Sequence, residues 1–128
     1  MKREVINSEK AFPAVGPYSH AVLVDGRTLF TSGSIGACPI DGRLKEGLEA
    51  QVEQALANLA AVLDEAGMSF DNVVKTTVFL RDMNDFPRAN EIYARCFPSD
   101  PPARSTVAAA GLPLDALYEV EAIAVKST

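Results

Sequence analysis

The longest periodic pattern of apolar residues covers residues 47–66. Its apolar positions recur every three or four residues, the spacing that places side chains along one face of an α-helix. The members of this stripe are Leu48, Val52, Ala55, Leu56, Leu59, Val62, Leu63 and Ala66. Polar residues such as Asn58 lie mostly off the stripe, and Gly67 stands where a left-handed residue would end the helix. The pattern predicts an amphipathic helix that buries one face.

A second helical pattern begins after residue 85. Asn84 or Asp85 is placed to cap it, and Pro87 falls in its first turn, where a missing N–H costs nothing. Pro98 follows its last apolar position and ends it. The apolar face consists of Phe86, Ala89, Ile92, Tyr93, Cys96 and Phe97.

Segments rich in β-branched and apolar residues predict strands. Asp25-Gly26 lies between two such segments and predicts a tight hairpin, because both turn positions favour positive φ. Residues 37–47 contain proline and two glycines and predict a loop. The expected strands are residues 3–6, 19–24, 28–32, 72–81, 103–110 and 117–126.

This order of elements predicts an α+β fold: a mixed six-stranded sheet with two helices on one face. Residues 1–128 are expected to form a single domain, since no linker or repeat interrupts them. The second face of such a sheet needs cover that a chain of this size does not supply. We therefore expect copies of the chain to cover it in a homo-oligomer.

Composition and charge limit the classes of function. The net charge of −5 and the lack of a Lys/Arg cluster argue against a nucleic-acid partner. One histidine and two cysteines make a metal site improbable, and the sequence has neither a P-loop nor a G-x-S-x-G motif. With no membrane-spanning stretch and an N-terminal segment unlike a signal peptide, the chain is expected to be cytoplasmic, away from membranes.

Arg104 is a candidate for binding an anion. It opens a predicted strand directly after Pro101-Pro102-Ala103, and the prolines stiffen the approach to it. A guanidinium on a stiff strand offers a preorganised fork to a carboxylate. The alternative is a surface arginine at a strand end.

Glu119 and Glu121 are candidates for proton transfer. Strand alternation places both on one face, in line with Leu117, Ile123 and Val125. Partial burial and mutual repulsion would raise the pKa of one of them and make it a usable proton carrier. The alternative is a charge pair that protects an edge strand from aggregation.

Five further positions carry weaker signals. Tyr18 follows a Gly-Pro turn and could wall a pocket, or could simply pack at a sheet edge. Ser32 and Gly33 end a predicted strand, where small residues let backbone N–H groups approach an anion; a plain turn is the alternative. Asn90 lies beside the apolar stripe of the second helix and is either a site residue or a surface residue. His20 is expected to be structural, since its neighbour Ser19 faces the other side of the strand.

Together these segments resemble the Rid family (reactive intermediate or imine deaminases of the YjgF type, also called the endoribonuclease L-PSP family). The resemblance covers nearly the whole chain. It rests on GPYSHA at 16–21, FTSGSIG at 30–36, VVKTTVFLRDMNDFPRANEIY at 73–93, PPARSTV at 101–107 and YEVEAIAV at 118–125.

The resemblance implies a chorismate-mutase-like (bacillus-type) fold assembled as a homotrimeric barrel with clefts between subunits. It implies a 2-iminobutanoate/2-iminopropanoate deaminase that forms 2-keto acids and ammonia without a cofactor or metal. Arg104 would bind the substrate carboxylate, and Glu119 would orient the attacking water with help from the backbone carbonyl near Thr106. Tyr18, Ser32, Gly33 and Asn90 would line or shape the cleft.

The chain departs from the family pattern at three places. His20 stands where the family often has Gln, Ser34-Ile35-Gly36 where it often has Gln-Ile-Pro, and Thr106 where the most active deaminases usually have Cys. The change at 34–36 falls in an expected loop beside the cleft and bears on substrate range. Three alternatives remain: a non-catalytic binding or regulatory protein with the same cleft, an endoribonuclease, and a chaperone-like role after chemical modification.

Overall fold

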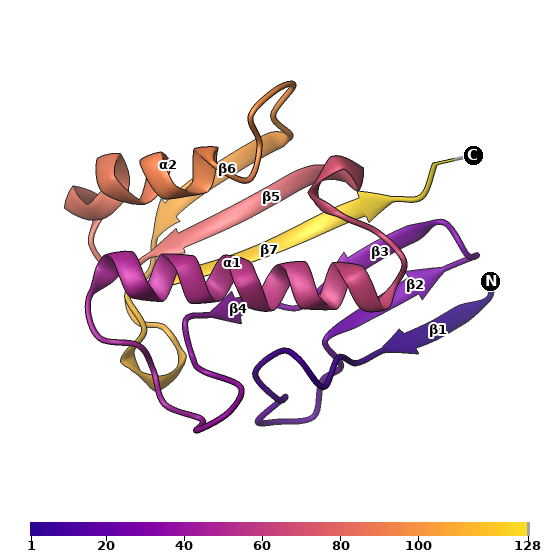
Figure 1. Cartoon of the computed structure of the whole chain (residues 1–128), viewed down its shortest axis with the longest axis horizontal. Coiled ribbons are helices and arrows are strands. Elements are labelled where there is room, and N and C mark those ends of the chain that lie inside the picture. Colours follow the sequence, from indigo (N-terminus) through magenta and orange to yellow (C-terminus); the bar gives the residue numbers. More distant parts are fainter. Residues whose placement is uncertain (128) are drawn as a thin grey trace.

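One mixed β-sheet forms the framework of the computed structural model, which describes residues 1–127. Its strands are β1 (Arg3–Ile6), β2 (Ala21–Val24), β3 (Thr28–Thr31), β4 (Ser34–Ile35), β5 (Val73–Leu80), β6 (Ala103–Ala108) and β7 (Tyr118–Val125). They lie in the order β1-β2-β3-β7-β5-β6, with β4 also beside β7. Helices α1 (Leu48–Glu65) and α2 (Phe86–Ala94) lie on one face of the sheet (Figure 1). The predicted α+β fold is confirmed.

The structure has one strand more than the sequence predicts, the two-residue β4. It pairs with β7 along the same edge as β3: Phe30 lies opposite Ile123, and Ser34 lies opposite Val120. Between these two stretches the Thr31 hydroxyl replaces a backbone partner and accepts the Ala122 N–H at 3.0 Å. The expected loop at 34–36 is therefore partly strand. A two-residue strand next to glycine carries no periodicity that a sequence pattern could reveal.

The first hairpin and the end of α1 form as predicted. Asp25 and Gly26 both have positive φ, 50° and 66°, and the Arg27 N–H donates to the Val24 carbonyl at 3.0 Å. Gly67 ends α1 with φ of 73°. The N–H of the next residue, Met68, reaches back to the Leu63 carbonyl at 2.9 Å, which gives the terminus a Schellman motif.

The start of α2 differs from the prediction that Asn84 or Asp85 caps it. Asp82 is the capping side chain, and it accepts the Asn84 N–H at 2.9 Å at the start of a short 3-10 helix, Met83–Asp85. Asp85 makes no side-chain cap bond to α2. The 3-10 turn precedes the α-helix without a break, so the exposed N–H groups that need a cap belong to that turn. Pro87 lies in the first turn of α2, as expected.

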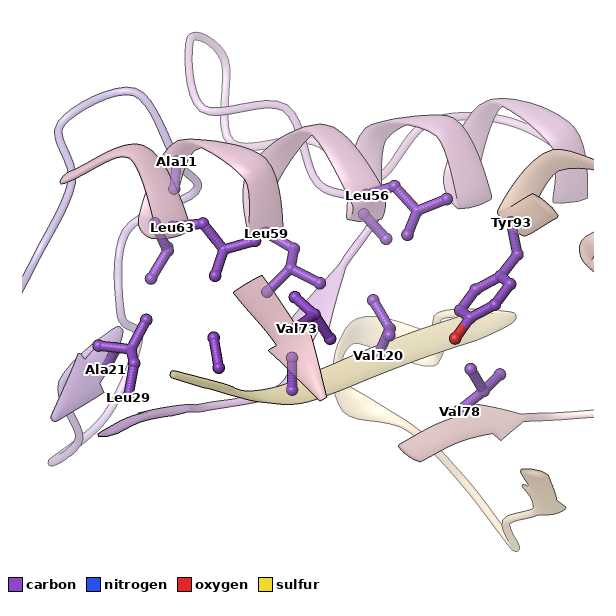
Figure 2. Close-up of a cluster of buried hydrophobic side chains, with 14 of the residues drawn as sticks. Ala11, Ala21, Leu29, Leu56, Leu59, Leu63, Val73, Val78, Tyr93 and Val120 are labelled. Atoms are coloured by element: carbon purple, nitrogen blue, oxygen red, sulfur yellow. The ribbon is translucent and has the colours of Figure 1, made fainter. Parts of the chain in front are cut away.

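The hydrophobic core fills the space between the helices and the sheet (Figure 2). Leu59 and Leu63 reach down from α1, and Val120 reaches up from β7; all three are fully buried. Tyr93 of α2 closes one end of this core. Each large aliphatic side chain buried in this way contributes about 1.5–3 kcal/mol. The two predicted apolar stripes are the faces that the helices bury.

The face of the sheet away from the helices is uncovered. Side chains alternate along β7, so Tyr118, Val120 and Ala122 are buried under the helices while Glu119 and Glu121 lie on the open face. The same face exposes large apolar side chains from three other strands. Val5, Phe30 and Val107 are 48%, 46% and 45% exposed. Neither helix in the described residues is long and apolar enough to cross a membrane.

Candidate active site

Arg104 lies on β6 with its side chain turned toward α2. It pairs with Thr76 of the parallel strand β5, and Thr76 is buried on the helix side of the sheet. The Arg104 guanidinium carbon lies 4.7 Å from the centre of the Tyr93 ring and 5.4 Å from that of Phe86. One guanidinium nitrogen donates to Asn90 Oδ1 at 2.8 Å. Arg104 is half-buried in this position, and β6 begins directly after the two prolines, as predicted.

Every partner that holds Arg104 is neutral. Within residues 1–127 the ion pairs involve Arg81 and Arg88, and none involves Arg104. Burial raises the pKa of the Tyr93 phenol despite its hydrogen bond to Thr76 and the nearby guanidinium, so this ring stays uncharged near neutral pH. The positive charge of Arg104 is therefore unopposed. It faces an open depression lined by Asn90, Tyr93, Phe97 and Pro101-Pro102, where an anion would meet it.

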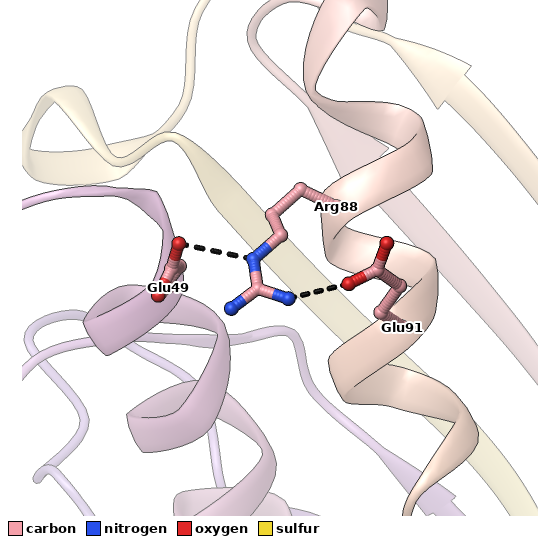
Figure 3. Close-up of polar contacts among 3 residues, drawn as sticks. All are labelled: Glu49, Arg88 and Glu91. Carbon is pink, nitrogen blue, oxygen red and sulfur yellow. Dashed lines mark hydrogen bonds and ion pairs between the residues drawn. The ribbon is translucent and has the colours of Figure 1, made fainter.

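Arg88 shows the contrasting case on the same helix. Its guanidinium bridges two exposed carboxylates, Glu49 of α1 at 3.0 Å and Glu91 of α2 (Figure 3). The hydrogen bond from Arg88 holds the pKa of Glu49 below its usual value. Both carboxylates neutralise this arginine, and it links the two helices at the surface. Its positive charge is therefore already balanced and is not available to bind a ligand.

Glu119 borders a second cavity, and its side chain leaves the sheet on the face opposite to that of Arg104. Burial raises the pKa of its carboxyl, and the nearby Glu121 adds to the effect, as expected from the sequence. The backbone of Gly33 packs directly against this carboxyl: a Cβ at position 33 would lie 2.5 Å from Glu119 Oε2. Only glycine allows this close approach. Glu119 is thus held as a half-buried base beside a short stretch of bare backbone.

Tyr18 and Ser32 line the same cavity as Glu119. The Tyr18 hydroxyl accepts the Val15 N–H at 3.4 Å, and the residue remains 44% exposed. The Ser32 hydroxyl donates to the Ser19 carbonyl at 2.6 Å and joins the end of β3 to the segment before β2. The residues predicted from 16–19 and 32–34 therefore meet at one cavity.

His20 also borders this cavity, and both of its ring nitrogens are engaged by backbone groups. Nδ1 accepts the Ser8 N–H at 3.0 Å, and Nε2 lies 2.9 Å from the Phe12 carbonyl, to which it donates. This arrangement requires the neutral ring with its hydrogen on Nε2. The histidine anchors the segment before Tyr18, in agreement with the expected structural role. Within residues 1–127 no three His, Cys, Asp or Glu side chains lie close enough together to hold a metal ion.

The candidate residues fall into two groups that one chain does not bring together. Asn90 and Arg104 border one depression, and Glu119 borders the other cavity with Tyr18, Ser32 and Gly33. Thr106 follows Arg104 on the helix side of β6, opposite the buried Val78, and its hydroxyl is buried without a partner. Within one chain the candidate arginine and the candidate glutamate therefore border different cavities.

The side-chain amides of Asn58 and Gln51, both on α1, hold the backbone near Glu119 in place. The sequence patterns did not identify either residue. Asn58 is buried, and its Nδ2 donates to the carbonyls of Ile35 at 3.0 Å and Ala37 at 2.9 Å. Gln51 is also buried and accepts the Leu117 N–H at 2.8 Å. Together they fix β4 and the start of β7, from which Glu119 projects. The prediction that Asn58 lies off the buried stripe is wrong; its spacing from Ala55 and Val62 was the available signal.

The structure gives a physical reason for the glycine at position 36, one of the positions where the chain departs from the family pattern. A Cβ at this position would overlap the backbone of Gln51, so α1 lies against the chain here with no room for a side chain. The absence of a side chain at position 36 lets the helix approach β4 closely. This approach brings the Gln51 and Asn58 amides within reach of the backbone that they bind.

The fold and the two cavities define a class: a small α+β protein with an arginine held by neutral groups at one depression and a half-buried glutamate at a second cavity. Comparison with known proteins identifies the family. The chain belongs to the Rid/YjgF family, whose model, described as Endoribonuclease L-PSP, matches residues 8–126. It is 49% identical to human 2-iminobutanoate/2-iminopropanoate deaminase over 97% of this chain and 90% of the human protein. It is 46% identical to Reactive Intermediate Deaminase A, chloroplastic, of Arabidopsis thaliana, over 97% of this chain and 66% of that protein.

Solved structures agree with the fold. The YjgF gene product from E. coli superposes with a TM-score of 0.91 at 39% identity, covering 97% of this chain and 99% of that one. E. coli TdcF, solved with bound serine, gives a TM-score of 0.92 at 38% identity with the same coverage. The expected chorismate-mutase-like arrangement is therefore confirmed for the single chain.

Proposed function

We propose that this chain is a 2-iminobutanoate/2-iminopropanoate deaminase, an enzyme that hydrolyses the C=N bond of small 2-imino acids. Water adds to the imine carbon, the carbon–nitrogen bond breaks, and a 2-keto acid and ammonia leave. One observation carries the proposal: Arg104 keeps an unopposed charge beside an open depression, in a chain nearly half identical to enzymes named for this reaction.

The active site in this proposal lies between subunits of a homotrimer, each of which is a single Rid-type domain over residues 1–128. Two features support it. The arginine and glutamate halves border separate cavities of one chain, and the sheet face that carries Glu119 exposes apolar side chains such as Phe30 and Val107. Association through that face covers it, and the two halves of the site join where the edge strand β6 of one copy, which carries Arg104, meets the Glu119 cavity of a neighbouring copy.

Each side chain then has a defined role. Arg104 binds the substrate carboxylate with its planar fork, and Asn90 holds the fork in place. Glu119 takes a proton from the attacking water; its raised pKa makes the carboxylate a stronger base than an exposed glutamate. The Thr106 carbonyl helps to orient that water. Tyr18, Ser32 and Gly33 wall the cavity around it.

No step in this scheme requires a metal or organic cofactor. The carboxylate clamp positions the imine carbon near the base, and positioning supplies much of the rate gain. Imines of this kind hydrolyse readily in water, so a modest acceleration protects other molecules from them.

The test is 2-keto acid formation when an amino-acid oxidase or a threonine dehydratase generates the imine in the cuvette. We expect the wild-type chain to accelerate it and Arg104→Lys to lose most of the activity, at least about tenfold, because an ammonium cannot reproduce a planar fork. Arg88→Lys is the matched control, since Arg88 lies in a surface ion pair, and should retain full activity. An Arg104→Lys variant as fast as the wild type contradicts the proposal.

An endoribonuclease has less support on this chain. The net charge is −5, and the one histidine uses both ring nitrogens on backbone groups. We therefore propose small 2-imino acids as partners, rather than nucleic acid or a membrane. A cytoplasmic location belongs to the same proposal; the two cysteines, both free, suit a reducing compartment, and cell fractionation tests it.

A further inference from the structure

The orientation of the Arg104 guanidinium is fixed from two directions by one helix. Asn90 binds an edge of the fork at 2.8 Å, and Tyr93, one turn further along α2, lies under its face at 4.7 Å. Phe86 adds a more distant contact from the start of the same helix. The edge contact alone leaves the guanidinium free to rotate about that bond. The ring beneath it restricts this rotation.

Tyr93 is itself held rigidly. Its side chain is 7% exposed, and its hydroxyl shares a hydrogen bond of 2.7 Å with Thr76 Oγ1. Thr76 is fully buried on β5 and pairs in register with Arg104 on β6. The Phe97 ring packs against the Tyr93 ring at 4.9 Å between centroids. The contacts with Thr76 and Phe97 hold the Tyr93 ring in place. The ring therefore does not move with the guanidinium and limits its rotation.

We propose that Tyr93, anchored by Thr76, is a positioning residue that presents the Arg104 fork to the substrate carboxylate. This inference rests on the function proposed above and deepens it. A carboxylate in the place of Tyr93 would hold the arginine more strongly but would compete with the substrate for its charge. An aromatic ring attracts the cation and leaves that charge available. A prearranged fork also loses less entropy when the ligand binds.

The experiment measures the Kd of 2-oxobutanoate, a stable keto acid with the same carboxylate, by calorimetry on the assembled protein, together with KM and kcat for imine hydrolysis. Tyr93→Leu removes the ring and should raise Kd and KM about 3- to 30-fold, the range spanned by cation–π contacts. Tyr93→Phe keeps the ring and should restore most of that loss. A purely structural role would lower the folded fraction, and with it kcat, while leaving the Kd of the folded protein unchanged.

Two further variants keep the test decisive if Tyr93→Leu does not fold. Tyr93→Phe and Thr76→Val each remove one side of the anchoring hydrogen bond without touching the ligand. We expect each to raise Kd about twofold, well below the effect of Tyr93→Leu, and the double variant to add little, because both break one interaction. Wild-type Kd in a folded Tyr93→Leu protein, or in both anchor variants, overturns the inference.

Arg104→Lys separates this inference from the proposed function. If Arg104→Lys binds 2-oxobutanoate as tightly as the wild type, the arginine is not the carboxylate ligand and both proposals fall. If it loses binding while the Tyr93 variants keep it, the deaminase proposal stands and the positioning role alone is wrong.

Discussion

Arg104 and Arg88 are the same side chain in two environments, and the environment decides what each can do. Arg88 meets two carboxylates at the surface and links the helices. Arg104 meets an amide and two aromatic rings, which orient it without neutralising it. The sequence placed Arg104 at the start of a strand after two prolines. From the sequence, Tyr93 is recognised only as part of an apolar helix face. The pattern did not reveal that its ring lies under the Arg104 guanidinium.

Glu119 should be required for turnover and dispensable for ligand binding. In Glu119→Gln the amide cannot take a proton from water, so we expect kcat to fall by at least about 100-fold, the usual contribution of a general base. The Kd of 2-oxobutanoate should stay within about threefold, because Arg104 supplies the carboxylate site. Calorimetry and the coupled assay on one preparation measure both. A parallel loss of binding and turnover would assign Glu119 a structural role instead.

The raised pKa of Glu119 also predicts how stability depends on pH. A carboxyl whose pKa is higher in the folded than in the unfolded state favours folding while it is protonated, and this contribution is lost as pH rises through the folded-state pKa. Glu119→Gln removes the buried charge. Urea unfolding should therefore show the variant to be more stable than the wild type at pH 7.5, with the difference shrinking toward pH 4. A difference that grows as the pH falls would mean that the carboxylate is stabilised in the folded protein.

The position of the Glu119 carboxyl depends on the backbone at Gly33. Its missing side chain makes room for the Glu119 carboxyl, so Gly33→Ala should displace that carboxyl and lower kcat/KM by about tenfold or more; a full 1 Å misplacement can cost about 100-fold. Gly111→Ala is the matched control, because nothing lies within 4 Å of a Cβ there. Equal activity in the two variants would show that the close approach of Gly33 to Glu119 is unimportant.

The elements themselves were largely predictable, and their junctions were not. Both helices, the Asp25-Gly26 hairpin and the long strands follow from periodicity and turn chemistry. The strand β4 and the cap at Asp82 do not, because each depends on a neighbour distant in sequence or on a turn only three residues long. The same holds for Asn58, whose two backbone carbonyl partners lie more than 20 residues away. Polar contacts between different elements produce no periodic pattern in the sequence.

Asn58 should be important for the stability of the β4 region. Asn58→Leu leaves the carbonyls of Ile35 and Ala37 without their donor, and we expect a loss of about 2–4 kcal/mol in the free energy of unfolding. Glu53→Gln on the exposed side of α1 should stay within about 0.5 kcal/mol of the wild type. Urea unfolding of both variants compares them. A neutral Asn58→Leu would mean that β4 is held by other contacts.

The whole molecule has one feature that a single chain leaves unexplained: an uncovered sheet face that carries both apolar side chains and Glu119. Val107 lies on that face at 45% exposure, next to Phe79 of β5. If copies associate there, Val107→Lys should separate the oligomer and abolish imine hydrolysis together. Ala57→Lys on the exposed side of α1 should change neither. Light scattering after gel filtration gives the mass of each species; a Val107→Lys trimer with full activity would place the interface elsewhere.

Mixed oligomers test whether the site takes its arginine and its glutamate from different copies. Arg104→Ala and Glu119→Gln, each inactive alone, are unfolded together, refolded as a mixture and assayed for imine hydrolysis. In random trimers of equal parts, about a quarter of the clefts pair an intact Arg104 with an intact Glu119 from the neighbouring copy. We therefore expect roughly a quarter of wild-type activity to return. A mixture no more active than the two variants assayed apart would mean that the site does not lie between subunits.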